Sequence, residues 1–247
     1  MSAVVCRLLP LQAMDGVHNM AADETLLESA AAGLASLRFY TWSEPTVSLG
    51  YFQAESIRRT DPLLTSLPWV RRPSGGAALI HDREVTYALA LPAGRPWQTG
   101  DSWLGRMHAI IRLALAELGV RAKVFSPVCI KEGPFTGLLC FRHFTACDLM
   151  IQNAKVVGSA QRRQRGTLVQ HGGVLLEQSP YTPALPGIRE LSGKELTAVQ
   201  VSERISQTFA AETGWTLTPG DWTDAERERT EVLAQEKYGS DAWNRKR

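Results

Sequence analysis

Residues 85–91, VTYALAL, constrain the fold more than any other segment, because large and small side chains alternate along them. In an extended strand, Val85, Tyr87, Leu89 and Leu91 would share one face. This alternation is typical of an antiparallel strand that packs one face on the core and leaves the other in solvent. We therefore expect a half-buried antiparallel strand here.

The surrounding segments predict a sheet with helices packed against it. Strand patterns bounded by turn residues recur at 37–42, 46–51, 69–72, 148–151, 155–158 and 167–176. Helical spacing of apolar residues occurs at 20–30 and 101–119, and the chain from residue 197 onward looks helical. The pattern is not one of repeated βαβ units. The sequence therefore predicts an α+β fold with a mixed, largely antiparallel sheet and flanking helices.

Charge and cysteine content exclude several classes of protein. The 27 Lys and Arg against 25 Asp and Glu leave a formal net charge of +2, which does not indicate a nucleic-acid partner. No apolar run approaches the roughly 20 residues of a membrane helix, and the first residues lack a signal-peptide pattern. The four cysteines are too few for a disulfide scaffold, and none forms a C-x-x-C pair. We expect a cytoplasmic protein with free thiols, no membrane partner and no metal site.

The run RRPSGGAALIHD at 71–82 is the most unusual segment. Gly75 and Gly76 lack a Cβ, so backbone amides there can approach a ligand and cradle a carboxylate, phosphate or thioester oxygen. Arg72 would add a planar, permanently charged donor. A hairpin turn with surface arginines explains the same residues, and His81 beside a turn is more often structural than catalytic. From the residues alone, both interpretations stay open.

Lys155 opens the return strand of a predicted hairpin and is followed by Gly158 and Ser159. A lysine beside a glycine that permits close approach can hold an acyl carbonyl or a phosphoryl oxygen, whereas a solvated hairpin lysine is the plainer interpretation. The basic cluster that follows is either a solvated edge or a contact for an acidic partner protein. Its members are Arg162, Arg163 and Arg165.

Cysteine chemistry depends on surroundings, because a free thiol is mostly protonated at neutral pH unless a nearby cation lowers its pKa. Cys140 follows a glycine-containing loop sequence and precedes Arg142 and His143. Cys6 and Cys129 have apolar neighbours. Loop placement beside Arg142 and His143 favours Cys140 as the reactive thiol, although no Cys/His spacing in the chain proves a pair.

Taken together, these segments resemble the lipoate/octanoate-attaching acyltransferase family, which is related to the biotin protein ligase catalytic fold. Six blocks carry the resemblance in order along nearly the whole chain. They are NMAADE at 19–24, LRFYTWSEPTVSLGYFQ at 37–53, RRPSGGAALIHD at 71–82, KVVGSAQ at 155–161, QHG at 170–172 and KYGSDAWN at 237–244. The resemblance implies one catalytic domain over 1–247, with C-terminal helices over about 197–247 and no accessory domain.

Within that family the chain is most similar to octanoyltransferases of the Gram-positive type. The segment REVTYAL at 83–89 differs from the strand usual in ATP-dependent lipoate–protein ligases, and Cys140-Phe141 stands where those octanoyltransferases carry a cysteine. Two positions depart from the family pattern. Ala77 replaces a third glycine of the ligases, and Cys147 stands where an aromatic residue is usual.

The resemblance implies a two-step acyl transfer without a cofactor. Cys140 would take an octanoyl group from an acyl carrier protein, and Lys155 would hold the thioester carbonyl and favour the thiolate. Backbone amides around Gly75 would form an oxyanion site, and an apolar tunnel would hold the octyl chain. His81 and His143 are candidate bases. The substrate-binding residues implied by the matching motifs are Arg72, Ser74, Gly75, Gly76, His81, Gly158, Ser159, His171 and Gly172.

The acceptor would be a lysine on a lipoyl domain of a 2-oxoacid dehydrogenase or on glycine cleavage H protein. One alternative is an ATP-dependent lipoate–protein ligase that works through an acyl-adenylate and needs ATP and Mg²⁺. Another is an amidotransferase that moves octanoate between lipoyl-domain proteins. A catalytically silent binder of lipoyl domains or acyl carriers is the alternative from a different class, and the presence of both Cys140 and Lys155 argues against it.

Overall fold

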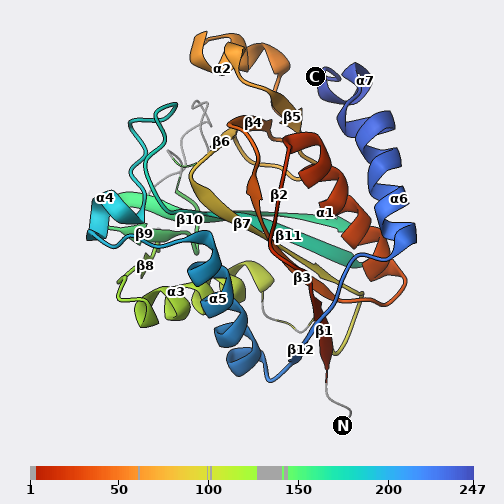
Figure 1. Ribbon diagram of the computed structural model, residues 1–247, viewed down its shortest axis with the longest axis vertical. Coiled ribbons are helices and arrows are strands. Elements are labelled where there is room, and N and C mark those ends of the chain that lie inside the picture. The colour runs from red at the N-terminus through yellow and green to blue at the C-terminus, as the bar shows by residue number, and fades with distance from the viewer. Residues whose placement is uncertain (1–3, 61, 99, 101, 127–140, 142–143) are drawn as a thin grey trace.

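The computed structural model describes residues 4–60, 62–98, 100, 102–126, 141 and 144–247. These residues form a large mixed sheet, a small sheet and helices on both faces of the large one (Figure 1). The strand order in the large sheet is β12-β1-β3-β7-β11-β10-β9-β8, and β2 also pairs with β3. β1, β2 and β12 pair in parallel, whereas β3 and β7 to β11 are joined antiparallel. The predicted α+β class is confirmed.

Among the described residues, nine strands form the large sheet and three form the small one. The strands of the large sheet are β1 (Val5–Leu8), β2 (Gln12–Met14), β3 (Ser36–Trp42), β7 (Glu84–Leu91), β8 (Lys123–Val124), β9 (Leu149–Ile151), β10 (Ala154–Gln164), β11 (Thr167–Leu175) and β12 (Thr216–Pro219). The small sheet has the order β5-β4-β6, from β4 (Thr46–Leu49), β5 (Trp69–Arg71) and β6 (Leu79–His81). The helices are α1 (Gly16–Ala31), η1 (Glu55–Thr60), α2 (Pro62–Ser66), α3 (Trp103–Glu117), α4 (Ile188–Ser192), α5 (Ala198–Thr213), α6 (Asp224–Leu233), the π-helical turn η3 (Ala234–Tyr238) and α7 (Asp241–Asn244).

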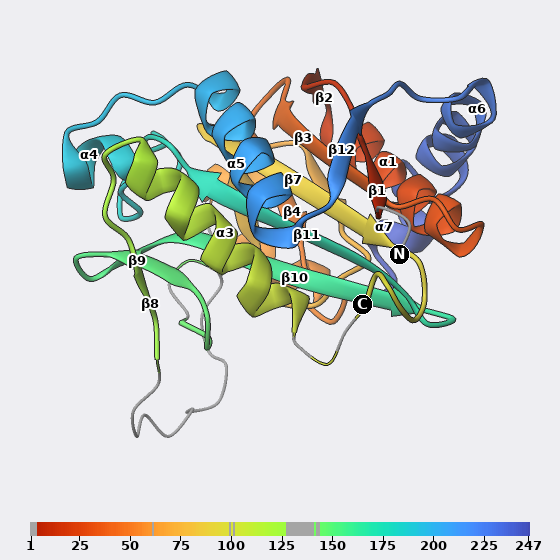
Figure 2. The same cartoon turned by 90° about the horizontal axis from the view of Figure 1, so that it is seen from below.

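The expectation of a half-buried strand at 85–91 is wrong, because β7 is buried on both faces. Its large side chains, such as Tyr87 and Leu89, pack in the core beneath α3 and α5. Its small side chains Ala88 and Ala90 pack against α1 on the opposite face. α1 covers one face of the large sheet, and α3 and α5 cover the other (Figures 1 and 2). The small residues let α1 pack close to the sheet, whereas the large ones fill the wider space beneath α3 and α5. The alternation in size therefore indicates a strand with both faces covered.

The C-terminal segment contains a strand as well as the helices expected over about 197–247. α5 ends at Thr213, and the capping residue Gly214 adopts the left-handed conformation with φ of 66°. The next residues form β12, which pairs in parallel with β1 at the other end of the chain. Local periodicity does not reveal this strand, because its pairing partner is distant in sequence.

The closing motif KYGSDAWN positions the arginine-containing loop. The Asn244 side-chain oxygen accepts a 2.8 Å hydrogen bond from the backbone N–H of Arg71, and the Trp243 indole donates to the Arg71 carbonyl at 2.7 Å. Arg71 itself is buried and donates to the carbonyls of Gly50 and Gln53. The end of the chain therefore fixes the start of the loop at 71–82. Among the described residues, no helix has the length and apolar character needed to cross a bilayer.

Candidate functional site

The sequence-predicted residues converge on one cavity of about 130 Å³ whose walls come from both sheets and from α1. Nine predicted site residues line it, namely Arg72, Gly75, Gly76, His81, Lys155, Gly158, Ser159, His171 and Gly172. Ser74 is buried beside the cavity and bonds to His171. Apolar side chains of Met20, Leu79 and Phe141 also contribute to the lining. The motifs that are scattered over a hundred residues of sequence thus meet around one space.

Cys140, the predicted nucleophile, lies outside the described residues, as do Cys129, Arg142 and His143. Phe141, the chain neighbour of Cys140, lines the cavity. Cys6 is buried in the core, where burial raises the pKa of its thiol to about 12 and the charge of Arg7 lowers it only in part. A thiol with such a pKa is not nucleophilic at neutral pH, so Cys6 fills space in the core, in keeping with its apolar sequence neighbours.

Lys155 is buried in the cavity wall with 4% of its surface exposed. Its ammonium lies 2.8 Å from the carboxylate of Asp148 and 5.2 Å from the centre of the Phe141 ring. The pairing register of β10 with β9 shifts between Lys155 and Val157, and such irregularities re-aim side chains near functional sites. Gly158 leaves room for the lysine stem, because a Cβ there would lie 2.3 Å from Lys155 Cε. The plainer interpretation of Lys155, a solvated hairpin lysine, is therefore wrong.

Arg72 holds the glycine-rich loop in place. Its guanidinium donates to the carbonyls of Ser48, Gly75 and Ala77 at 3.0, 2.9 and 2.6 Å. Gly76 has φ of 92°, a conformation that side-chain-bearing residues rarely adopt. Arg72 thus has two roles: it fixes the loop that shapes the cavity, and it places a positive charge in the cavity lining.

Among the residues that the structure describes, three serine–histidine pairs surround the cavity. In the first, Ser74 Oγ lies 2.5 Å from His171 Nε2, and His171 Nδ1 lies 2.9 Å from Asp23. Asp23 is also held by Arg38 at 3.2 Å and Tyr40 at 3.0 Å. The carboxylate can only accept, so a neutral His171 donates from Nδ1 and accepts the Ser74 hydroxyl proton at Nε2.

The second pair joins Ser48 Oγ to His81 Nε2 at 2.8 Å, with His81 Nδ1 2.6 Å from Glu84. His81 also stacks on Trp42 with ring centres 3.7 Å apart. Burial lowers the pKa of His81 more than the charge of Glu84 raises it, so the ring is neutral at neutral pH. Ser48 is fully buried and also accepts from Arg72.

The third pair was not predicted. His108, on α3, places Nε2 2.6 Å from Ser159 Oγ and Nδ1 2.6 Å from the carbonyl of Cys147. Tyr87 bonds to the same Ser159 oxygen at 2.7 Å. His108 could not be found from the sequence because it sits in an apolar helix without a motif. Asp148 gave no signal either, because only the fold pairs it with Lys155.

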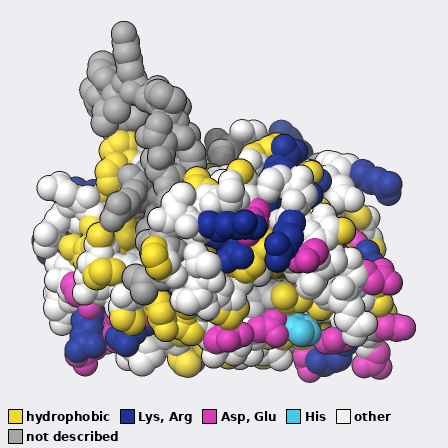
Figure 3. All heavy atoms as spheres, turned by 90° about the horizontal axis from the view of Figure 1, so that it is seen from above, with side chains coloured by type: hydrophobic (Ala, Val, Ile, Leu, Met, Phe, Trp, Pro, Cys, Tyr) yellow, Lys and Arg dark blue, Asp and Glu magenta, His cyan; other side chains and the backbone are white. Residues whose placement is uncertain are grey.

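A cationic and aromatic rim lies next to the cavity loop. The Phe52 ring would be 3.8 Å from a Cβ on Gly75, and Lys246 stands 3.7 Å from the centre of the Tyr51 ring. Partial burial, and then neighbouring positive charges, lower the pKa of Lys246 to about 8. Those charges belong to Arg71, Lys237, Arg247 and Arg162. Lys and Arg side chains gather around apolar ones on the face that carries α7 (Figure 3).

The three arginines of the predicted basic cluster do not share one face. Arg162 lies 5.8 Å from the Tyr51 ring and so joins the rim. Arg163 points away and donates to Gln98 at 2.6 Å, because neighbouring residues on a strand face opposite sides. Arg165 lies at the β10–β11 turn with φ of 49°. Only Arg162 of this cluster contributes to the surface near the cavity.

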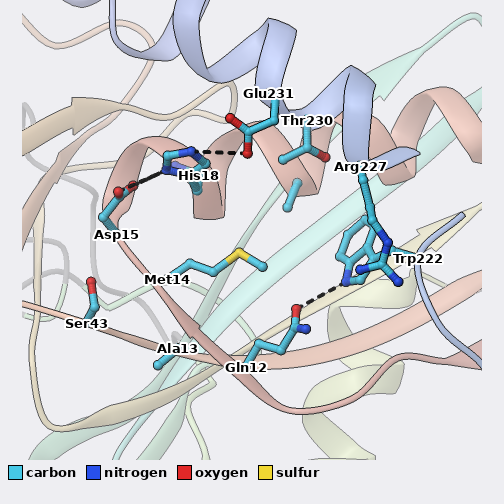
Figure 4. A pocket seen from close by; sticks show the side chains of 11 residues that line it. Gln12, Ala13, Met14, Asp15, His18, Ser43, Trp222, Arg227, Thr230 and Glu231 are labelled. Carbon is cyan, nitrogen blue, oxygen red and sulfur yellow. Dashed lines mark hydrogen bonds and ion pairs between the residues drawn. The ribbon is translucent and has the colours of Figure 1, made fainter. Parts of the chain in front are cut away.

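A second, more open pocket of about 450 Å³ lies between the start of α1 and α6. Figure 4 shows His18 there between Asp15 and Glu231, with ring nitrogens 2.9 and 3.5 Å from the two carboxylates. None of the residues predicted from the sequence as site residues lines this pocket. In the described part of the chain, no group of three or more His, Cys, Asp or Glu is arranged to hold a metal ion.

Comparison with known proteins identifies the family. Residues 15–184 match the lipoyl protein ligase A/B catalytic domain. The chain is 32% identical to octanoyltransferase LipM of Kyrpidia tusciae, over 96% of this chain and 97% of that protein. It is 30% identical to octanoyltransferase LipM of Brevibacillus brevis, over 98% of this chain and 99% of that protein. The chain belongs to the lipoyl protein ligase A/B catalytic domain family.

The solved structures agree with this family at the level of fold. A crystal structure of lipoate-protein ligase A bound with ATP superposes with a TM-score of 0.77 at 19% identity, covering 98% of this chain and 99% of that one. The family match ends at residue 184, so α5, β12 and α6 follow the matched region. The full-length relatives nevertheless include that C-terminal part.

Proposed function

We propose that this chain is an octanoyltransferase of lipoate biosynthesis, which moves an octanoyl group onto a lysine of a lipoyl domain or glycine cleavage H protein. Relatives named as octanoyltransferases, aligned over nearly the full chain, support acyl transfer. The observation that carries the proposal at the site is the buried Lys155 ammonium, which faces a cavity formed by the motifs that resemble the family.

The reaction proceeds in two acyl transfers. The Cys140 thiolate attacks the thioester carbonyl of octanoyl-acyl carrier protein and a new C–S bond forms. The old C–S bond breaks, and the carrier sulfur leaves as a thiolate with its electron pair. The lysine amine of the acceptor then attacks the acyl-enzyme, forming an amide and releasing Cys140. The first step exchanges one thioester for another and the second forms a more stable amide, so no ATP is consumed.

Lys155 stabilises negative charge in both steps. Its ammonium is held by Asp148 in a buried setting, where a positive charge interacts more strongly than in water. Directed at the thioester oxygen, it favours the tetrahedral intermediate, and backbone amides of the loop at Gly75 and Gly76 add donors. The apolar lining from Met20, Leu79 and Phe141 suits the hydrocarbon chain.

The cationic rim supports an acidic protein as partner. Lys246 and Arg247 make no ion pair with a carboxylate in the part of the chain that the structure describes, although they stand close to other cations. A partner that brings carboxylates or a phosphate group relieves this repulsion and speeds association. The rim borders the loop at Gly75, so a docked carrier would present its acyl group near the cavity.

Intact-mass measurement tests the proposal. After incubation with octanoyl-acyl carrier protein and no ATP, the wild-type chain should gain one octanoyl group, and Cys140→Ala should gain none. Cys6→Ala is the matched control and should still be acylated, because the Cys6 thiol is buried with a raised pKa. An adduct that persists in Cys140→Ala would refute the cysteine mechanism. Transfer that requires octanoate, ATP and Mg²⁺ instead would establish the ligase alternative.

A further inference from the structure

The three serine–histidine pairs differ in their access to the cavity. Ser48 is fully buried and Ser74 is 2% exposed, whereas Ser159 is partly exposed and lines the cavity on the same strand as Lys155. Its partner His108 is 1% exposed and lies behind it. Of these three pairs, the one formed by Ser159 and His108 therefore combines a hydroxyl open to a ligand with a base shielded from solvent.

The directions of the hydrogen bonds follow from one backbone carbonyl. The Cys147 oxygen can only accept, so His108 carries its proton on Nδ1, and its Nε2 is then an acceptor. Ser159 must donate its hydroxyl proton to Nε2 at 2.6 Å. Tyr87, which receives a 2.6 Å hydrogen bond from Gln170, in turn donates to Ser159. One lone pair of the Ser159 oxygen is left to face the cavity, where it can accept from an N–H group.

The surroundings keep the imidazole neutral. Burial lowers the pKa of His108, and the ammonium of Lys155 lowers it further, while the Cys147 carbonyl and Asp148 act in the opposite direction. Cys147 adopts φ of 76°, in the left-handed region that is unfavourable for a residue with a side chain. The fold thus retains a strained residue at the carbonyl that sets the tautomer of His108.

We propose that Ser159 and His108 form the proton relay for the second acyl transfer, with Ser159 contacting the attacking lysine amine and His108 accepting its proton through Ser159. As the amine nitrogen bonds to the acyl carbon, the N–H proton moves to Ser159 Oγ and the hydroxyl proton moves to His108 Nε2. The C–S bond then breaks, and its electron pair leaves with the cysteine sulfur. The relay returns to its starting state when His108 passes the proton back through Ser159 to the thiolate or to solvent.

This inference rests on the proposed function, and single-turnover kinetics separates the two. Acylated enzyme is first prepared with octanoyl-acyl carrier protein, and an acceptor lipoyl domain is then added. In Ser159→Ala and His108→Gln, release of the octanoyl group to the acceptor should slow about 100-fold more than formation of the acyl-enzyme does, within the range for general base catalysis. A wild-type chain that forms no acyl-enzyme would refute the proposed function instead.

The double variant and the pH profile distinguish a relay from mere packing. Because both residues serve one relay, the double variant should be no slower than the slower single variant, whereas independent structural damage would add. In the wild type the transfer rate should fall as the pH drops through the lowered pKa of His108, and His108→Gln should lack this acidic limb. The groups facing His108 are Asp148, Lys155 and, through Ser159, Tyr87.

Two further variants complete the experiment. His108→Asn can keep a donor to the Cys147 carbonyl while losing the proton acceptor, so it should fold as wild type and transfer as slowly as His108→Gln. His18→Gln carries the same substitution in the other pocket and should transfer at the wild-type rate. Additive losses, or an acidic limb that survives in His108→Gln, would overturn the relay.

Discussion

The cavity at Lys155 and the open pocket at His18 both place a histidine among polar groups, yet they shift its pKa in opposite directions. Burial lowers the pKa of His108 at the cavity. At His18, burial also lowers the pKa, but hydrogen bonds and charges from Asp15 and Glu231 outweigh it and raise the pKa above its ordinary value. His18 is partly exposed and contacts two carboxylates directly, whereas His108 is buried and bonds to a carbonyl and a hydroxyl, so burial outweighs the polar neighbours only at the cavity.

The same contrast extends to energetics. Around the cavity, the polar side chains are buried and bonded to one another, so removing one leaves a partner unsatisfied. In the open pocket, water can replace a lost partner. Substitutions at the cavity should therefore lower stability and activity the most, and those in the open pocket the least. Substitution of the buried residue that anchors α6 should have an intermediate effect.

The largest effect is expected at Lys155. Lys155→Met removes the ammonium from the cavity and leaves Asp148 as a buried charge without its cation. The free energy of unfolding should therefore fall by about 3–5 kcal/mol. Acyl transfer should fall by about 10²- to 10³-fold, as for other losses of a charge-stabilising group. Chemical denaturation and single-turnover kinetics measure the two effects.

A double variant separates stability from chemistry at this pair. Lys155→Met with Asp148→Asn removes both charges, so most of the stability should return while the activity stays low. Activity that recovers together with stability would show that Lys155 acts only by holding the fold.

The second test concerns the support beneath the open pocket. Glu226 is buried and bonds to Arg7 through both carboxylate oxygens at 2.7 and 2.8 Å, which ties α6 to β1. Burial raises the pKa of Glu226, but hydrogen bonds from Arg7 and Ser29 outweigh it and lower the pKa to about 2. A pKa below the unfolded value means that the carboxylate stabilises the fold at neutral pH, and this contribution is lost as the pH falls from about 4.5 toward 2.

Glu226→Gln should therefore lower the free energy of unfolding by roughly 3 kcal/mol at pH 7. The difference from wild type should shrink in denaturation experiments as the pH is lowered toward 2. If Glu226→Gln were as stable as wild type at pH 7, the contrast between the buried and the exposed region would fail, because a buried ion pair would then stabilise the fold no more than an exposed one.

The smallest effect is expected at His18, whose side chain is 36% exposed. Its raised pKa means that the protonated ring stabilises the fold below its unfolded pKa of about 6.5, and the contribution disappears as the pH rises through the folded value. Exposure to solvent screens the interaction, so His18→Gln should cost no more than about 1 kcal/mol at pH 5.5 and nothing at pH 9. Thermal melting at the two pH values measures this difference, and a larger loss at pH 9 would contradict it.

Many of the site residues were predictable from sequence motifs, but the arrangement of these motifs around one cavity was not. The loop at 71–82, the Lys155 hairpin and the segment at 170–172 line one cavity, because each motif requires a local backbone shape that the sequence encodes directly. His108 and Asp148 were not predicted. Their roles depend on partners across the fold, and no local signal marks a histidine in an apolar helix or an aspartate at the start of a strand.

The sequence by itself determined the α+β class, most element positions and the family resemblance, because hydrophobic periodicity, turn residues and motifs act over short stretches of chain. The tertiary structure decided that β7 is buried on both faces, that β12 pairs with β1, and that Lys155 is a buried cation rather than a solvated one. It also lowered the pKa values of His81 and His108, in both cases through burial. Burial and long-range pairing set all of these properties, and neither is a property of a residue and its immediate neighbours in sequence.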